Sequence, residues 1–194
     1  MNYNLFQLIN QFAGRFPVLD GLMVVISQVS LHIYALILII MWFYRKENYK
    51  HTVVFATMTG IAGLVTNFII SHIYFEPRPF VTHDDVQLLF YHAADASFPS
   101  DHTTGAFALS LFVYLCHRKI GSAMIILAVF TGISRIYVGH HYPYDVLGSI
   151  MIALTASLFI FKIRKYLSSI PKTLIFMFNR IPFVAERSQG EKKE

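Results

Sequence analysis

The chain has little of what a soluble or disulfide-linked protein needs. Cys116 is its only cysteine, so an intrachain disulfide is impossible and a zinc site made of cysteines is excluded. Charged residues make up only 14% of the chain, well below the roughly 25% of an ordinary soluble domain. The N-terminal segment lacks the basic stretch and the small-residue cleavage site of a removable signal peptide, so we expect no such peptide.

Apolar sequence, by contrast, is abundant. Hydrophobic residues make up 55% of the 194 residues, and the mean hydropathy is +0.52. A helix needs roughly 17 to 25 residues to cross the hydrocarbon core of a bilayer. Runs near that length lie at about 22–44, 53–74, 100–116, 121–139 and 146–163, the third being the shortest. The sequence therefore predicts an all-α fold, a polytopic membrane bundle with about five transmembrane helices.

Two further segments suit the membrane interface. Apolar residues recur at mostly helical spacing between residues 3 and 13, ahead of Pro17, which predicts an N-terminal interfacial helix rather than a crossing. The segment after Pro171 is a second candidate. We expect residues 1–185 to form a single membrane-embedded domain and residues 186–194, ERSQGEKKE, to be a disordered cytoplasmic tail.

The positive charge is distributed as membrane-anchoring charge rather than as a nucleic-acid surface. The net charge is +5, but the Lys and Arg residues form short clusters beside the apolar runs. Most of them fall in the connections after the first and third spans and from Lys162 onward. Since such clusters mark the cytoplasmic side, we expect the N-terminus outside, the C-terminus in the cytoplasm, and no nucleic-acid partner.

This orientation places every segment with unusual polar chemistry on the outer face. These segments are EPRPF at 76–80, PSDH at 99–102 and SRIYVGHHYPYD at 134–145. Because helix ends on one side of a small bundle are neighbours, we expect their polar residues to line one pocket. The candidates are Arg78, Ser100, His102, Arg135, His141 and Asp145.

Each phosphate-binding candidate also has a purely structural interpretation. Ser100 before an apolar run is a good helix N-cap, whose neighbouring N–H groups attract anions, but capping alone would explain it. Arg78, held between two prolines, could fix an anion or contact a lipid phosphate. Arg135 lies inside an apolar span, where a charge needs a cavity or a partner such as Asp145.

The histidines suggest phosphoryl chemistry. His141 and Asp145 are four residues apart, with Pro143 between them indicating a helix start or a tight turn. A carboxylate on one imidazole nitrogen would leave the other free to attack, and His102 could protonate the departing oxygen. A metal site of His102, His140, His141 and Asp145 is the rival, but two arginines would repel a metal and replace its charge. We expect no metal and no cofactor.

Together these segments resemble the signature of the type 2 phosphatidic acid phosphatase superfamily, which reads K-x6-R-P, P-S-G-H and S-R-x5-H-x3-D. Arg78 and Pro79 match the end of the first motif, and Ser134 and Arg135 begin a full match to the third. There are two departures. Ser71 stands where the family has lysine, and Asp101 where it usually has glycine, and both departures should affect substrate affinity more than the reaction. Asp101 could instead recognise a feature of the substrate. Ser71, Asp101 and Ser134 are candidate modulators.

The resemblance implies a reaction and a residue for each role. His141 would attack phosphorus to form a phosphohistidine, Asp145 would orient it, and His102 would protonate the leaving group, with no metal. Arg78, Arg135 and Ser100 would hold the phosphoryl oxygens. The small size and the PSDH variant are similar to bacterial undecaprenyl pyrophosphate phosphatases of the bacitracin-resistance type, which recycle the lipid carrier of cell-wall synthesis at the plasma membrane.

Three alternatives stay open at this point. The substrate could be phosphatidate, phosphatidylglycerol phosphate or a related lipid, with the same chemistry. The protein could instead transport or bind a lipid or drug without chemistry, although the sequence contains no evident inverted repeats. A purely structural role would leave the clustered His, Arg and Asp residues unexplained. The sequence gives no oligomeric state.

Overall fold

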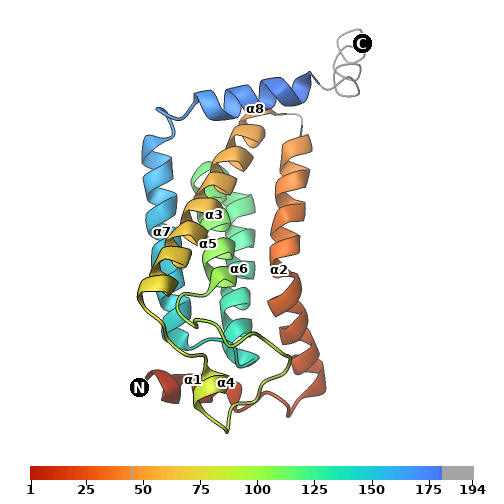
Figure 1. Cartoon of the computed structure of the whole chain (residues 1–194). Helices are drawn as coiled ribbons and strands as arrows, with labels where there is room; N and C mark the ends of the chain where they lie inside the picture. The colour runs from red at the N-terminus through yellow and green to blue at the C-terminus, as the bar shows by residue number, and fades with distance from the viewer. Residues whose placement is uncertain (45, 181–194) are drawn as a thin grey trace.

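The computed structural model describes residues 1–44 and 46–180, so the predicted tail at 186–194 lies outside the described residues. Within them the chain is helical and contains no named strand, which confirms the all-α prediction. Figure 1 shows the helices in chain order. They are α1 (Asn2–Asn10), α2 (Pro17–Phe43), α3 (Glu47–Ile73), α4 (Pro79–Thr82), α5 (Asp101–Cys116), α6 (Arg118–Tyr137), α7 (Pro143–Ile163) and α8 (Ser169–Asn179).

Five of these helices form the bundle, and they correspond to the five predicted spans. In the described part of the chain, α2, α3, α6 and α7 are long and apolar enough to cross a membrane. The fifth, α5, has 16 residues, or about 24 Å at ~1.5 Å per residue. It packs against α2, α3, α6 and α7. Because its neighbours shield it, α5 need not match the full thickness of the bilayer.

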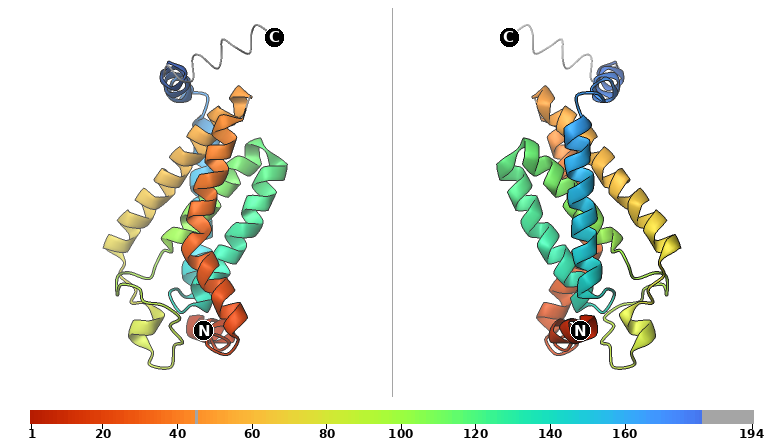
Figure 2. Two further views of the ribbon diagram at one scale, coloured as in Figure 1. Left: turned by 90° about the vertical axis from the view of Figure 1, so that its right-hand side faces the viewer. Right: turned by 90° about the vertical axis from the view of Figure 1, so that its left-hand side faces the viewer.

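The short α5 creates a recess at one end of the bundle. Figure 2 shows that it begins above the lower ends of α6 and α7. The approach of α5 to α6 is close: a Cβ on Gly121 would lie 2.2 Å from the Tyr114 Cα atom, so only glycine fits there. At the other end of α5, the loop that precedes it carries buried polar residues, among them Ser97 and Ser100.

The two short terminal helices cover opposite ends of the bundle. In Figure 1, α8 lies across the top, whereas α1 and α4 lie at the bottom, beside the start of α7. The exposed side chains of α8 include Leu174, Phe176 and Met177, as expected of an interfacial helix. The loops predicted to carry the polar chemistry all lie at the α1 end.

α1 is docked onto the bundle more firmly than an interfacial helix requires. Leu8 and Phe12 are exposed, but Phe6 is fully buried against Tyr142, with 5.8 Å between ring centroids. The buried Asn10 amide donates to the carbonyls of Gln87 and Tyr137, both at 2.9 Å. α1 thus fastens the loop after α4 to the end of α6.

Candidate active site

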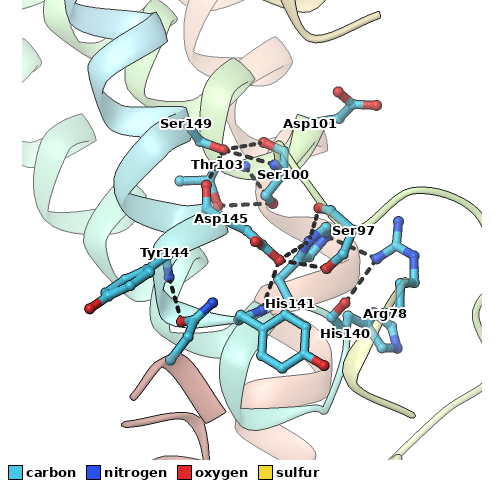
Figure 3. Close-up of polar contacts among 12 residues, drawn as sticks. Arg78, Ser97, Ser100, Asp101, Thr103, His140, His141, Tyr144, Asp145 and Ser149 are labelled. Carbon is cyan, nitrogen blue, oxygen red and sulfur yellow. Dashed lines mark hydrogen bonds and ion pairs between the residues drawn. The ribbon is translucent and has the colours of Figure 1, made fainter. Parts of the chain in front are cut away.

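A cavity of about 510 Å3 opens at the α1 end of the bundle, where the three polar segments meet. Arg78, His102 and Arg135 line it, together with Asp101 and Ser71. The remaining predicted residues are buried beside it rather than on its surface. These are Ser100, Ser134, His141 and Asp145. The structure therefore brings residues from the beginnings of α4, α5 and α7 and from the end of α6 to one place. Figure 3 shows Arg78, Ser100, His141 and Asp145 among them.

Arg78 is held by three contacts at the beginning of α4. Its Nε donates to Asp95 Oδ1 at 2.7 Å, and its Nη1 donates to the His140 carbonyl at 3.0 Å. The same Nη1 lies 3.1 Å from His141 Nε2. Arg78 as a whole residue is 5% exposed. The guanidinium thus stands between the cavity and the ring of His141.

The imidazole of His141 is fixed from the other side by the loop before α5. Its Nδ1 lies 2.8 Å from the carbonyl oxygen of Ser97, as seen in Figure 3. A carbonyl can only accept, so Nδ1 carries the proton and Nε2 has a free lone pair. Arg78 donates to that lone pair. The tautomer expected of an attacking histidine is therefore the one that the contacts favour.

Asp145 lies close to this histidine but is not its nearest partner. The Oδ2 atom is 3.5 Å from His141 Nδ1, while it accepts hydrogen bonds from Ser97 Oγ at 2.5 Å and from the Tyr142 amide at 2.8 Å. The latter contact belongs to the N-terminal cap of α7, which begins at Pro143 as the sequence indicated. Asp145 is therefore linked to His141 mainly through Ser97, a residue outside the sequence motifs.

The guanidinium of Arg135 is only partly satisfied by protein groups. Arg135 is 2% exposed, and its Nη1 donates to Ser27 Oγ of α2 at 2.8 Å. Within residues 1–44 and 46–180, its Nε and Nη2 have no hydrogen-bond partner. The ion pair with Asp145 considered from sequence is absent from these residues. A buried cation with free donors facing a cavity is suited to an anionic ligand.

Ser100 caps α5, as the structural interpretation predicted. Its Oγ accepts from the Thr103 hydroxyl at 3.0 Å and from the Thr103 amide at 3.4 Å. The amide of Ser100 donates to Ser149 Oγ at 2.8 Å. The serine oxygen thus accepts within the protein, and the amides at the start of α5 are further anion donors. Ser134 is likewise engaged internally, donating to the Thr131 carbonyl at 2.7 Å.

The two departures from the motifs lie on the α3 side of the cavity. The Ser71 hydroxyl donates to the Phe68 carbonyl of its own helix at 3.0 Å. The Asp101 carboxylate accepts from the Asn67 amide at 2.8 Å, and Figure 3 shows it turned away from the group around His141. Asp101 therefore faces α3, which reduces its repulsion of an anion held near Arg78.

The loop histidines near the cavity are held in their neutral forms. Burial lowers the pKa of His141 well below its ordinary value, and the nearby charges of Arg135 and Arg78 lower it further. Burial and Arg135 likewise lower the pKa of His140 to about 3. His141 therefore keeps an unprotonated Nε2 at neutral pH, which a nucleophile requires.

The arrangement offers no evident metal cage in the part of the chain that is described. No group of three or more His, Cys, Asp or Glu side chains there is placed to hold a metal ion. Of the four ligands considered from sequence, His141 and Asp145 adjoin each other, while His140 Nε2 contacts the Phe90 carbonyl at 3.1 Å. The cations that line the cavity are instead the two arginines, and the carboxylates of Asp95 and Asp101 line it as well.

A buried neutral histidine beside two arginines, at the recessed end of a helical membrane bundle, is the arrangement of a membrane phosphatase. Residues 51–169 match the PAP2 superfamily, and the chain belongs to this superfamily. This confirms the resemblance to type 2 phosphatidic acid phosphatases seen in the sequence.

Individual relatives cover nearly the whole chain. It is 45% identical to undecaprenyl-diphosphatase BcrC of Bacillus subtilis (strain 168), over 93% of either chain. It is 30% identical to the bacitracin transport permease protein BcrC of Bacillus licheniformis, over 90% of this chain and 86% of the relative. In structure it resembles LpxE of Aquifex aeolicus, with a TM-score of 0.70 and 28% identity over 83% of this chain and 94% of the other.

Proposed function

We propose that this membrane phosphatase hydrolyses undecaprenyl diphosphate to undecaprenyl phosphate and inorganic phosphate. The observation that carries the proposal is the His141 ring, whose Nδ1 is fixed by the Ser97 carbonyl while Nε2 lies 3.1 Å from Arg78 beside the cavity. The diphosphatase name of the Bacillus subtilis relative, at 45% identity, supports the choice of substrate.

The proposed reaction has two displacements at phosphorus. His141 Nε2 attacks the terminal phosphorus, an N–P bond forms, and the bond from that phosphorus to the bridging oxygen breaks. His102, which lines the cavity, gives a proton to the departing undecaprenyl phosphate. Water, deprotonated by the now neutral His102, then attacks the phosphorus of the phosphohistidine. An O–P bond forms, the N–P bond breaks with its electron pair returning to His141 Nε2, and inorganic phosphate leaves.

Charge stabilisation in both steps falls to the cavity walls. Arg78, Arg135 and the amides at the start of α5 are placed to bind the equatorial oxygens of the transferred phosphoryl group. The free Nε and Nη2 donors of Arg135 suit this role. Ser100 contributes by capping α5. Phosphoryl transfer needs mainly positioning and charge, and these groups supply both.

The apolar lining and the location of the cavity support a lipid substrate. Leu64, Phe68 and Phe75 of the α3 region line it next to the polar groups. A diphosphate could therefore enter while its chain stays in the bilayer. We further propose that the α1 end faces outward and the α8 end faces the cytoplasm of a bacterial cell, because the cationic connections cluster at the α8 end.

The test uses purified protein in detergent. It is given undecaprenyl diphosphate or phosphatidate in parallel assays, and phosphate release from each lipid is measured. We expect a preference for the diphosphate. A strong preference for phosphatidate would show that the proposed substrate is wrong, while the proposed phosphohistidine mechanism would still apply. Drug efflux from cells without phosphate release in vitro would favour a transporter, the activity in the name of the Bacillus licheniformis relative.

Asp145→Asn should lower turnover about 10- to 100-fold and change KM less than about threefold, because the carboxylate acts on the orientation and charge of His141 and not on the lipid. The isosteric amide can keep the contact with Ser97 Oγ but loses the negative charge. Steady-state kinetics of phosphate release measures both constants. Turnover equal to that of the wild type would refute a role for this carboxylate.

A further inference from the structure

Asp95 holds Arg78 although it belongs to none of the three sequence motifs. It lies in the loop between α4 and α5, and its Oδ1 accepts from Arg78 Nε at 2.7 Å. The two partners differ in environment, since the side chain of Arg78 is 6% exposed and that of Asp95 is 62% exposed. Asp95 also lines the cavity. A carboxylate that contacts solvent thus reaches one of the two buried cations expected to bind phosphate.

The contacts of Arg78 define how it can move during the proposed reaction. Its Nη1 donates to His141 Nε2, so this contact must break before Nε2 can attack phosphorus. Asp95 binds Nε, on the opposite edge of the guanidinium from that contact. Rotation about the Nε contact would turn Nη1 from the imidazole and from the His140 carbonyl towards a phosphoryl group. Asp95 therefore fixes one edge of the guanidinium while the other exchanges partners.

The charge of Asp95 also affects the affinity of the cavity for anions. Two guanidiniums in a recessed site would bind a phosphate dianion strongly, and release of inorganic phosphate would then be slow. A carboxylate that pairs with Arg78 offsets part of this attraction. Its exposure to solvent moderates the effect through screening. No comparable carboxylate pairs with Arg135 among the described residues.

We propose that Asp95 is a positioning residue that anchors Arg78 and weakens the binding of inorganic phosphate, so that the product is released. The proposal deepens the proposed function and rests on it for the identity of the product. The anchoring of Arg78 by Asp95 does not depend on the identity of the product.

The test measures binding of inorganic phosphate to the purified, lipid-free protein by calorimetry, and inhibition by phosphate during turnover. We expect Asp95→Asn to bind phosphate about 5- to 10-fold more tightly than the wild type. Asp95→Glu, which keeps the charge, should restore the wild-type affinity to within about twofold. Asp95→Ala should also bind phosphate more tightly, and its turnover should fall as Arg78 loses its anchor.

Asp84→Asn is the matched control, because Asp84 is an exposed aspartate of the same loop and does not line the cavity. Its phosphate affinity should stay within about twofold of the wild type. Unchanged or weaker phosphate binding in Asp95→Asn would overturn the proposal, as would an equal change in Asp84→Asn. Phosphate binding is measured without lipid. Failure of the wild type to cleave the lipid would therefore refute the proposed function separately.

Discussion

Replacing His141 by alanine should reduce phosphate release from undecaprenyl diphosphate by about 10^3-fold or more. The loss follows because no other group supplies the attacking atom: the imidazole has an unprotonated Nε2 and a fixed orientation through the Ser97 carbonyl. A lowered pKa keeps that nitrogen neutral. Phosphate released by equal amounts of purified wild type and variant measures the effect.

His51→Ala is the control for loss of a histidine. His51 lies on α3 at the far end of the bundle, near Glu47, and its removal should leave activity within about twofold. If the His141 variant kept more than a tenth of the wild-type rate while folded, His141 would not be the nucleophile.

Arg135→Met should lower kcat/KM by about 10^3-fold while leaving the protein as stable as the wild type or more so. The guanidinium is buried and has two donors without protein partners in the described chain. A buried charge with unpaired donors lowers the stability of the protein without substrate. During the reaction the same charge is expected to stabilise the negative charge that develops at the phosphoryl oxygens. Methionine fills much of the same volume without the charge. Kinetics and thermal unfolding of the same samples measure both effects.

Ser27→Ala separates the effect of positioning Arg135 from the effect of its charge on kcat/KM. It removes one hydrogen bond at 2.8 Å and keeps the guanidinium, so kcat/KM should fall by no more than about tenfold. A large loss of thermal stability in Arg135→Met would contradict the account, since it would assign this arginine to the fold. Activity near that of the wild type would contradict it equally.

Much of the fold could be predicted because bilayer crossing requires long apolar runs. Each of the five predicted spans begins and ends within six residues of its helix, and the alternation of helix ends brings the three polar segments to one side. Pro143 correctly indicated a helix start. The docking of α1 was not predicted, because its amphipathic pattern suits lipid and protein surfaces alike.

Site residues outside the motifs could not be found in this way. Ser27 lies 108 positions from Arg135, and Ser97 lies 44 positions from His141. Neither position has a pattern that links it to its partner. Ser97 reaches the histidine through a backbone carbonyl, which any residue type carries.

Spacing also gave an incomplete account of two predicted contacts. His141 and Asp145 are four residues apart and do adjoin, but the nearest acceptor to the histidine comes from another loop. For Ser100 the sequence allows a phosphate ligand or a cap, and the structure shows the cap, with its Oγ accepting from Thr103. Local patterns predict which residues gather, while the order of partners depends on the tertiary fold.

The covalent intermediate provides the most direct test of the central claim. Wild-type protein would be mixed with undecaprenyl diphosphate labelled in its terminal phosphate, and the reaction would be stopped with base during turnover. The protein would then be digested, and its peptides sequenced by mass spectrometry. The account predicts a phosphoryl group on His141. Turnover with no labelled protein, or with the label on another residue, would contradict it.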